Sequence, residues 1–267
     1  MTSPPEGGGR PATSSLRPPG LGLLLAEIRG IFEFNASLMM SPLLMRAPKG
    51  DGHPVLALPG FLASDLSMMP MRRYLTELGY DAHAWQLGRN LGGLARRRTA
   101  LLERLEEIHA RTRRKVSLIG WSLGGVYARD LALHAPDMVR YVMTLGSPFA
   151  NDVRATNATR LYEALADETV GDDPEFLEAI SGDLPVPATS IFSRADGVVN
   201  WQTCLLRPST AAENVEVYLA SHLGLGVNPA VLWAVADRLA QQEGHFSQFD
   251  RSGPFAIAYA PPERAQS

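Results

Sequence analysis

The feature that most constrains the fold of this chain is a six-residue stretch between a predicted strand and a predicted helix. The sequence GWSLGG, residues 120–125, follows the β-rich run 116–119 and leads into a helical pattern. A sharp turn from a strand into a helix needs small residues two positions before and after its centre, because a Cβ at either place would collide with the backbone. Gly120 and Gly124 meet that need. The turn would expose the hydroxyl of Ser122, which makes Ser122 a candidate nucleophile.

The helix that begins after Ser122 adds a second functional group. Its first backbone N–H, that of Leu123, has no acceptor within the helix, and the helix dipole favours negative charge at this end. The N–H of Leu123 could therefore donate to an oxyanion that forms beside Ser122. One motif supplies both a nucleophile and an oxyanion donor.

Two later strands end in an acid and in a histidine. The run 188–193 reads as a buried strand and is followed by Asp196, and the predicted strand 215–219 is followed by His222. Because active sites of open parallel sheets gather at the carboxyl ends of the strands, we expect Asp196, His222 and Ser122 at one edge. Asp152, which follows another predicted strand end, is the alternative acid.

This arrangement resembles the α/β-hydrolase superfamily, and most closely its bacterial lipases and esterases. In that superfamily the nucleophile, the acid and the histidine follow one another in this order along the chain. The resemblance covers about residues 50–243 and implies that Ser122, Asp196 and His222 form a catalytic triad.

The resemblance also implies a second oxyanion donor. After the predicted strand 55–58, Pro59-Gly60-Phe61-Leu62 occupies the place where related lipases carry a His-Gly or Pro-Gly pair. The backbone N–H of Phe61 is then the second donor. Gly60 would let the chain turn sharply toward the serine, so that two N–H groups could lie about 3 Å from the oxyanion.

From residue 55 onward, predicted strands and helices alternate. This alternation predicts an α/β fold with a mainly parallel, doubly wound sheet and helices on both faces. Only one segment, residues 150–187, departs from it, with two short helical patterns at 156–167 and 174–180. In the resembling family this is the place of a lid insertion. We expect Leu161 and Phe176 from it, together with Leu62 and Trp121, to contact an apolar acyl group.

The amino-terminal residues divide into two parts. Residues 1–20 are rich in Pro, Gly, Ser and Thr, which predicts a disordered tail. Residues 21–49 form an apolar segment in which Leu21, Leu24, Leu25, Ile28 and Phe32 recur at helical spacing. Charged residues interrupt the segment, which argues against a membrane-spanning helix or a signal peptide. We expect a helix packed on the hydrolase domain of residues 50–267, with peripheral membrane contact as the alternative.

Composition adds few constraints. The 267 residues are 45% hydrophobic and 20% charged, with a formal net charge of −3, which suits one soluble catalytic domain and gives no reason to expect a nucleic-acid partner. A single cysteine, Cys204, excludes an internal disulfide and a thiolate cluster. We therefore expect a cytoplasmic enzyme without a metal ion or cofactor.

The sequence thus predicts a serine esterase or lipase that forms an acyl-enzyme on Ser122. Trp121 replaces the histidine that often precedes the nucleophile in lipases, which favours an esterase. Two alternatives share the same residues: an acyltransferase, and a binding protein that retains the fold without catalysis. Motifs of this kind do not specify the acyl-chain length, because chain length is read by the shape of the pocket.

Overall fold

The computed structural model describes residues 16–166, 173–207 and 209–265, with the side chains at 160, 161, 165 and 166 left out of the description. Most of the predicted disordered tail, residues 1–15, lies outside the described residues. So does the acidic connection 167–172 between the two helical patterns of the predicted lid.

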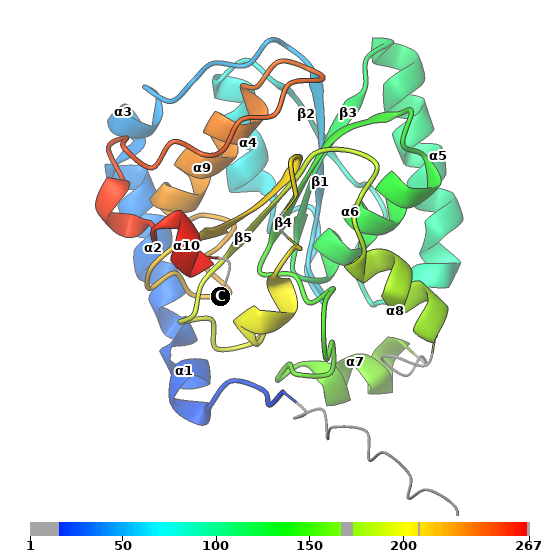
Figure 1. The fold of residues 1–267 in the computed structure, drawn as a ribbon, viewed down its shortest axis with the longest axis vertical. Helices are drawn as coiled ribbons and strands as arrows, with labels where there is room; N and C mark the ends of the chain where they lie inside the picture. Colours follow the sequence, from blue (N-terminus) through cyan, green and yellow to red (C-terminus); the bar gives the residue numbers. More distant parts are fainter. Residues whose placement is uncertain (1–15, 167–172, 208, 266–267) are drawn as a thin grey trace, which may run out of the picture.

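The centre of the molecule is a six-stranded sheet in which all neighbouring strands are parallel (Figure 1). Its order is β2-β1-β3-β4-β5-β6. The strands are β1 (Pro54–Leu58), β2 (Asp81–Ala84), β3 (Val116–Trp121), β4 (Val139–Leu145), β5 (Ala188–Phe192) and β6 (Ala212–Glu216). Since all strands run the same way, the loops after β3, β5 and β6 emerge at one edge.

Alternate residues of the strands enter two separate cores. In β1, Val55 and Ala57 pack into one hydrophobic cluster, whereas Leu56 and Leu58 pack into the other. This period of two is what a strand covered on both faces requires. The first cluster includes α3 (Ser41–Leu44), α4 (Met69–Glu77) and α9 (Pro229–Leu239), and the second includes α5 (Leu94–Thr112), α6 (Leu123–His134) and α8 (Pro174–Ser181). The predicted doubly wound α/β architecture is confirmed.

Two helices stand between β4 and β5, as the sequence predicted. They are α7 (Thr159–Ala166) and α8, which begins at Pro174. The side chain of Asp173, directly before α8, accepts a hydrogen bond from the backbone N–H of Phe176 at 2.9 Å. This cap and Pro174 at the first helical position explain where α8 starts. The contacts of the α8 side chains with the second core fix the helix against α6.

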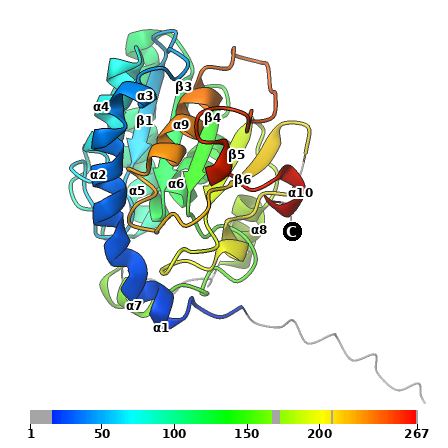
Figure 2. The same ribbon diagram turned by 90° about the vertical axis from the view of Figure 1, so that its left-hand side faces the viewer.

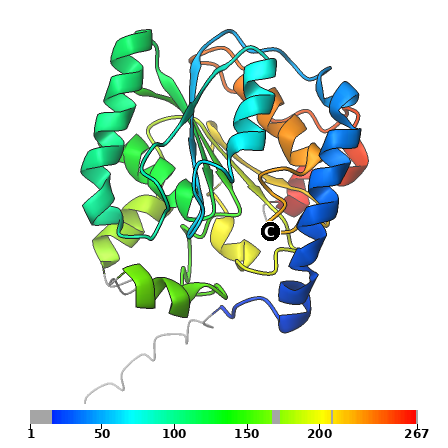
Figure 3. The same cartoon turned by 180° about the vertical axis from the view of Figure 1, so that it is seen from behind.

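The segment before β1 forms a nearly continuous helical column. It consists of α1 (Leu21–Leu25), the 3-10 helix η1 (Ala26–Arg29), α2 (Gly30–Met39) and α3, and it runs along one side of the molecule (Figures 2 and 3). No helix among the described residues is both long enough and apolar enough to cross a membrane.

The column packs on the domain, as predicted, but through its charged side rather than its apolar side. Leu21, Leu25, Ile28 and Phe32 are 67–72% exposed, whereas Glu27 is only 5% exposed. The helical period was read correctly, but the charged side of the column faces the domain. The physical reason is that Glu27 and Glu33 accept hydrogen bonds from backbone N–H groups of distant loops, which the sequence pattern does not reveal.

One strand is also displaced from its predicted position. The structure ends β6 at Glu216, whereas the sequence predicted a strand over 215–219. Val217 leaves the β6 ladder and forms an isolated antiparallel bridge with Tyr259, and the N–H of Tyr218 donates to Ala258. The alternation of apolar residues that predicted a strand therefore continues past the end of β6, to Val217 in this bridge.

Three short elements remain, one after β5 and two after α9. These are the 3-10 helices η2 (Trp201–Cys204) and η3 (Ala256–Ala258), followed by α10 (Pro262–Ala265). The side chain of Cys204 in η2 is buried and forms no disulfide.

Candidate active site

Ser122 occupies a strained turn between β3 and α6. Its backbone angles, φ 54° and ψ −123°, lie in a region that a residue with a Cβ seldom adopts, at a cost of about 1–3 kcal/mol. A Cβ on Gly120 would overlap the carbonyl of Gly124, and a Cβ on Gly124 would overlap the carbonyl of Leu58. The two glycines are therefore required by close backbone contacts, as the motif predicted.

The predicted acid and base lie against each other at the same edge. The Oδ2 of Asp196 is 2.6 Å from the Nδ1 of His222, and both residues are less than 5% exposed. The other carboxylate oxygen of Asp196 accepts the backbone N–H groups of Val198 and Val199 at 2.8 and 2.7 Å. These bonds fix the carboxylate. Asp152, the alternative acid, instead accepts the N–H of Arg154 at 3.2 Å.

The charge around His222 favours its protonated form. Burial lowers the pKa of the imidazole, but the neighbouring Asp196 carboxylate and the charge of Glu27 outweigh burial and raise that pKa above the usual 6.5. When the ring is neutral, an N–H on Nδ1 facing Asp196 leaves Nε2 as the acceptor. That is the tautomer a general base needs.

Trp121 connects the histidine loop with the serine turn. Its indole N–H donates to the backbone carbonyl of His222 at 3.0 Å, and the two ring centroids lie 6.1 Å apart. Because Trp121 directly precedes Ser122, this contact places His222 beside the turn. Trp121 was expected to contact substrate, but it does not line the cavity described below.

The loop that carries Phe61 is held close to Ser122. A Cβ on Gly60 would lie 3.1 Å from the Cβ of Ser122. Asn90, which is fully buried, fixes this loop. Its side-chain amide donates to the backbone carbonyl of Pro59 at 2.8 Å, and its backbone carbonyl accepts the N–H of Leu62 at 2.7 Å. Leu62 has φ 61° and, like Trp121, lies outside the cavity lining.

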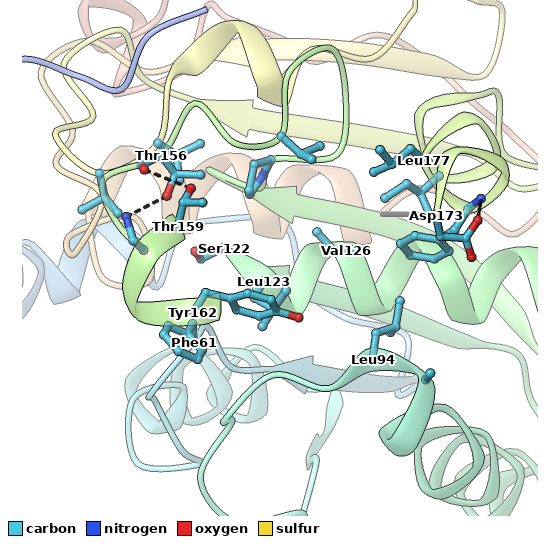
Figure 4. A pocket seen from close by; sticks show the side chains of 18 of the residues that line it. Phe61, Leu94, Ser122, Leu123, Val126, Thr156, Thr159, Tyr162, Asp173 and Leu177 are labelled. Carbon is cyan, nitrogen blue, oxygen red and sulfur yellow. Dashed lines mark hydrogen bonds between the residues drawn. The ribbon is translucent and has the colours of Figure 1, made fainter. Parts of the chain in front are cut away.

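A cavity of about 580 Å³ opens at Ser122 (Figure 4). Ser122 lies toward the end where Thr156 and Thr159 stand, and Leu177 lies at the other end. Phe176 lines the cavity, as predicted, together with Phe61 and Leu123. The backbone of Leu161 belongs to α7, but its side chain lies outside the described residues.

The far part of the cavity is mostly apolar, although Arg98 and Asp173 also line the cavity. Leu94, Val126, Leu177 and Ile180 contribute apolar side chains there. The guanidinium of Arg98 donates two hydrogen bonds, at 2.8 and 2.9 Å, to the buried carboxylate of Asp130, which offsets its charge. A hydrocarbon chain attached to a carbonyl at Ser122 would therefore find a mostly apolar surface.

Two residues near the site, Gly146 and Glu27, were not among the predicted site residues. Gly146 has φ 55°, and a Cβ there would lie 3.1 Å from Asp196 Oδ2 and 3.2 Å from His222 Nδ1. Glu27 accepts the backbone N–H of His222 at 3.0 Å. The glycine directly after a predicted strand was visible in the sequence, whereas nothing near Glu27 in the sequence points to residue 222. Among the described residues, no three His, Cys, Asp or Glu side chains gather as a metal site would require.

Solved lipases share this architecture. The structure is similar to a lipase from Bacillus licheniformis, with a TM-score of 0.54 and 18% identity over 74% of this chain and 95% of that one. It is also similar to Aspergillus fumigatus lipase B, with a TM-score of 0.56 and 18% identity over 72% of this chain and 53% of that one. The chain has the α/β-hydrolase fold. A monoacylglycerol lipase from Paleococcus ferrophilus shares it, with a TM-score of 0.51 and 12% identity over 71% of this chain and 96% of that one.

Sequence comparison does not place this α/β-hydrolase fold in a narrower group. No model of a known protein family matches the chain, and no curated protein matches it. At identities below 20% the shared structure shows the fold alone, so the reaction has to be argued from the site.

Proposed function

We propose that this protein is a serine hydrolase that cleaves carboxylic esters with an apolar acyl group. The proposal rests on one juxtaposition. A strained serine lines a mostly apolar cavity, and a buried, hydrogen-bonded histidine–aspartate pair lies at the same sheet edge. A lone Ser-containing turn would not need such a pair, and a purely structural pair would not need the cavity.

The reaction would follow from these groups. Ser122 Oγ forms a bond to the ester carbonyl carbon while His222 Nε2 takes the hydroxyl proton, and Asp196 stabilises the imidazolium. The backbone N–H groups of Phe61 and Leu123 would bind the resulting oxyanion. Collapse breaks the ester C–O bond, and His222 returns the proton to the leaving alcohol.

Water then completes the cycle. It attacks the acyl carbon, its proton passes to His222, and the carboxylic acid is released as Ser122 recovers its proton. The observation that favours an apolar acyl group is the lining of the cavity beyond Ser122 by Leu94, Val126 and Leu177. Helices α7 and α8 would act as a lid over this cavity, since Tyr162 of α7 and Phe176 of α8 both line it.

A fluorophosphonate probe tests the proposal. An activated serine reacts with the probe, so mass spectrometry of the labelled protein should find the adduct on Ser122 alone. Hydrolysis of p-nitrophenyl esters, followed with and without an added alcohol, then identifies water or alcohol as the acyl acceptor. Absence of labelling at Ser122 in folded protein would contradict the proposal and leave a binding function.

The cavity predicts a dependence on chain length. We expect the double variant Phe176→Ala and Leu177→Ala to hydrolyse acetate esters almost normally but to lose kcat/KM on longer chains. Each methylene that loses its contact is worth about 1–3 kcal/mol. A series of p-nitrophenyl esters of increasing acyl length measures the effect.

Leu184→Ala provides the matched control. Leu184 packs against the same core from the same insertion, but it does not line the cavity. Its loss should lower the melting temperature without changing the preference among chain lengths. Equal losses on all chain lengths in the double variant would show that Phe176 and Leu177 only hold the insertion together.

A further inference from the structure

The buried carboxylate of Glu27 connects the two loops that carry Asp196 and His222. Its Oε1 accepts the backbone N–H groups of Gly197 at 2.7 Å and His222 at 3.0 Å, and its Oε2 accepts that of Leu223 at 2.9 Å. Gly197 directly follows Asp196. One side chain from the amino-terminal column thus contacts both loops beside the histidine–aspartate pair.

Two further charged side chains of the column reinforce this contact. Arg29 donates to the carbonyl groups of Ala195 and Ala220, and Glu33 accepts the N–H of Ser221 at 2.8 Å. The backbone of Leu23 packs so closely on Gly197 that a Cβ on this glycine would overlap the Leu23 carbonyl. The column therefore binds the acid loop and the histidine loop by polar contacts along its length.

We infer that Glu27 is a positioning residue for the proposed reaction: it fixes the spacing between the Asp196 and His222 loops and places a second negative charge behind the histidine. This inference rests on the proposed function. An unpaired buried carboxylate would be strongly unfavourable, whereas three N–H donors compensate its burial. Those donors belong to the loops whose separation sets the Asp196–His222 distance.

The charged groups around His222 give this role a direct readout. They are Asp196 from the loop after β5 and Glu27 from the column. Glu33 and Arg29 contact the histidine loop at Ser221 and Leu219, one and three residues before His222. Asp196 and Glu27 raise the pKa of His222 against the opposing effect of burial. Since a general base must be neutral, the acid limb of kcat/KM follows this pKa, and removal of the Glu27 charge should move the limb to lower pH.

Glu27→Gln tests the inference. The amide has one good acceptor oxygen, so at least one of the three N–H groups loses its partner. We expect kcat to fall about tenfold, which corresponds to one hydrogen bond to a charged group, with KM nearly unchanged. The acid limb should move to lower pH, and an NMR titration of labelled histidine should show the lower pKa of His222 directly.

Glu33→Gln is the matched control, since Glu33 is a second inward-facing carboxylate of the same column and contacts Ser221 rather than His222. It should lower the melting temperature comparably but leave the His222 pKa in place. An unmoved His222 pKa in Glu27→Gln, or equal kcat losses in both variants, would overturn the inference. If no ester is hydrolysed at all, the proposed function fails, while the NMR titration still decides the role of Glu27.

The outward side of the column carries a second, independent observation. It exposes a continuous set of large apolar side chains, each more than half exposed: Leu21, Leu25, Ile28, Ile31, Phe32, Leu38 and Met39. Leu219 and Leu223, from the loop that carries His222, are 78% and 54% exposed. We call this set the outer apolar face. A patch of this kind marks an interaction site.

The charged residues that flank the outer apolar face in the sequence indicate what covers it. Between residues 16 and 49 the exposed charged side chains are Arg17, Arg46 and Lys49, all cationic, because Glu27 and Glu33 turn inward. We propose that the outer apolar face docks on an anionic lipid surface, with these cations at the headgroups. A helical face of this composition binds a membrane through apolar burial combined with attraction to anionic lipids.

Vesicle sedimentation tests this docking. The protein should co-sediment with phosphatidylglycerol-containing vesicles and bind more weakly to vesicles of pure phosphatidylcholine. The double variant Ile28→Ser and Phe32→Ser should no longer bind the anionic vesicles. Ile257→Ser is the matched control, because Ile257 is 94% exposed in η3, outside the outer apolar face. Retained binding in the double variant would overturn the proposal. So would a dimer in solution that the double variant splits, which would assign the face to a second copy.

Discussion

Ser122→Ala should lose ester hydrolysis by a factor on the order of 10⁶ in kcat, as in serine hydrolases whose nucleophile has been removed. The change deletes one oxygen and keeps the Cβ, so the strained backbone at φ 54° and the core beneath it should persist. An unchanged melting temperature and circular dichroism spectrum, together with loss of fluorophosphonate labelling, are the measurements.

Ser67→Ala makes the same chemical change outside the cavity. Ser67 lies in the loop before α4, where its hydroxyl donates to the carbonyl of Ser64 at 2.7 Å. Its activity and labelling should match the unmodified protein. Turnover by Ser122→Ala near the unmodified level would contradict the whole mechanism, because no other group has been assigned the attack.

The second large effect concerns the acid. Asp196→Asn should lower kcat by about 10⁴, the loss known for the equivalent change in a serine protease. An amide at this position can keep the bonds from Val198 and Val199 to its oxygen, but its NH₂ group then faces Nδ1 of His222. The imidazole would turn to the wrong tautomer, with its proton on the nitrogen that should accept.

Asp152→Asn separates the two acids that follow strand ends. Its carboxylate contacts the backbone of Arg154 and not the histidine, so the change should leave kcat within a few-fold of the unmodified value. Rate profiles of both variants across pH measure the effect. A larger loss in Asp152→Asn than in Asp196→Asn would transfer the role of the acid to Asp152.

The parts of the site that the sequence predicted are those set by local backbone. Ser122 could be found because a tight turn leaves a local mark, two glycines at fixed spacing. Asp196 and His222 could be placed at one edge because both follow strands of a parallel sheet, and parallel strands end together. The doubly wound fold followed from the same alternation of strands and helices.

The parts that the sequence missed depend on contacts between distant residues. Asn90 holds the Phe61 loop through Pro59 and Leu62, about thirty positions away in the chain, and Glu27 reaches residues 170 to 196 positions away. A periodic pattern reports that a helix has two sides but not which side meets the protein. For residues 21–39 the backbone N–H groups of the partner loops bind the charged side of the column, and the apolar side is exposed.

The contacts of the amino-terminal column also determine when the site can form. Glu27 and Glu33 are synthesised early, but their partners at 221–223 follow almost two hundred residues later. Contacts of such high sequence separation close large loops, which makes them costly in chain entropy and slow to form. During translation, Glu27 and Glu33 lack their partners in the histidine loop until β6 and the residues after it have been made. The carboxylates of the column therefore wait for almost two hundred residues of chain before they can bind the histidine loop, which favours late formation of this part of the site.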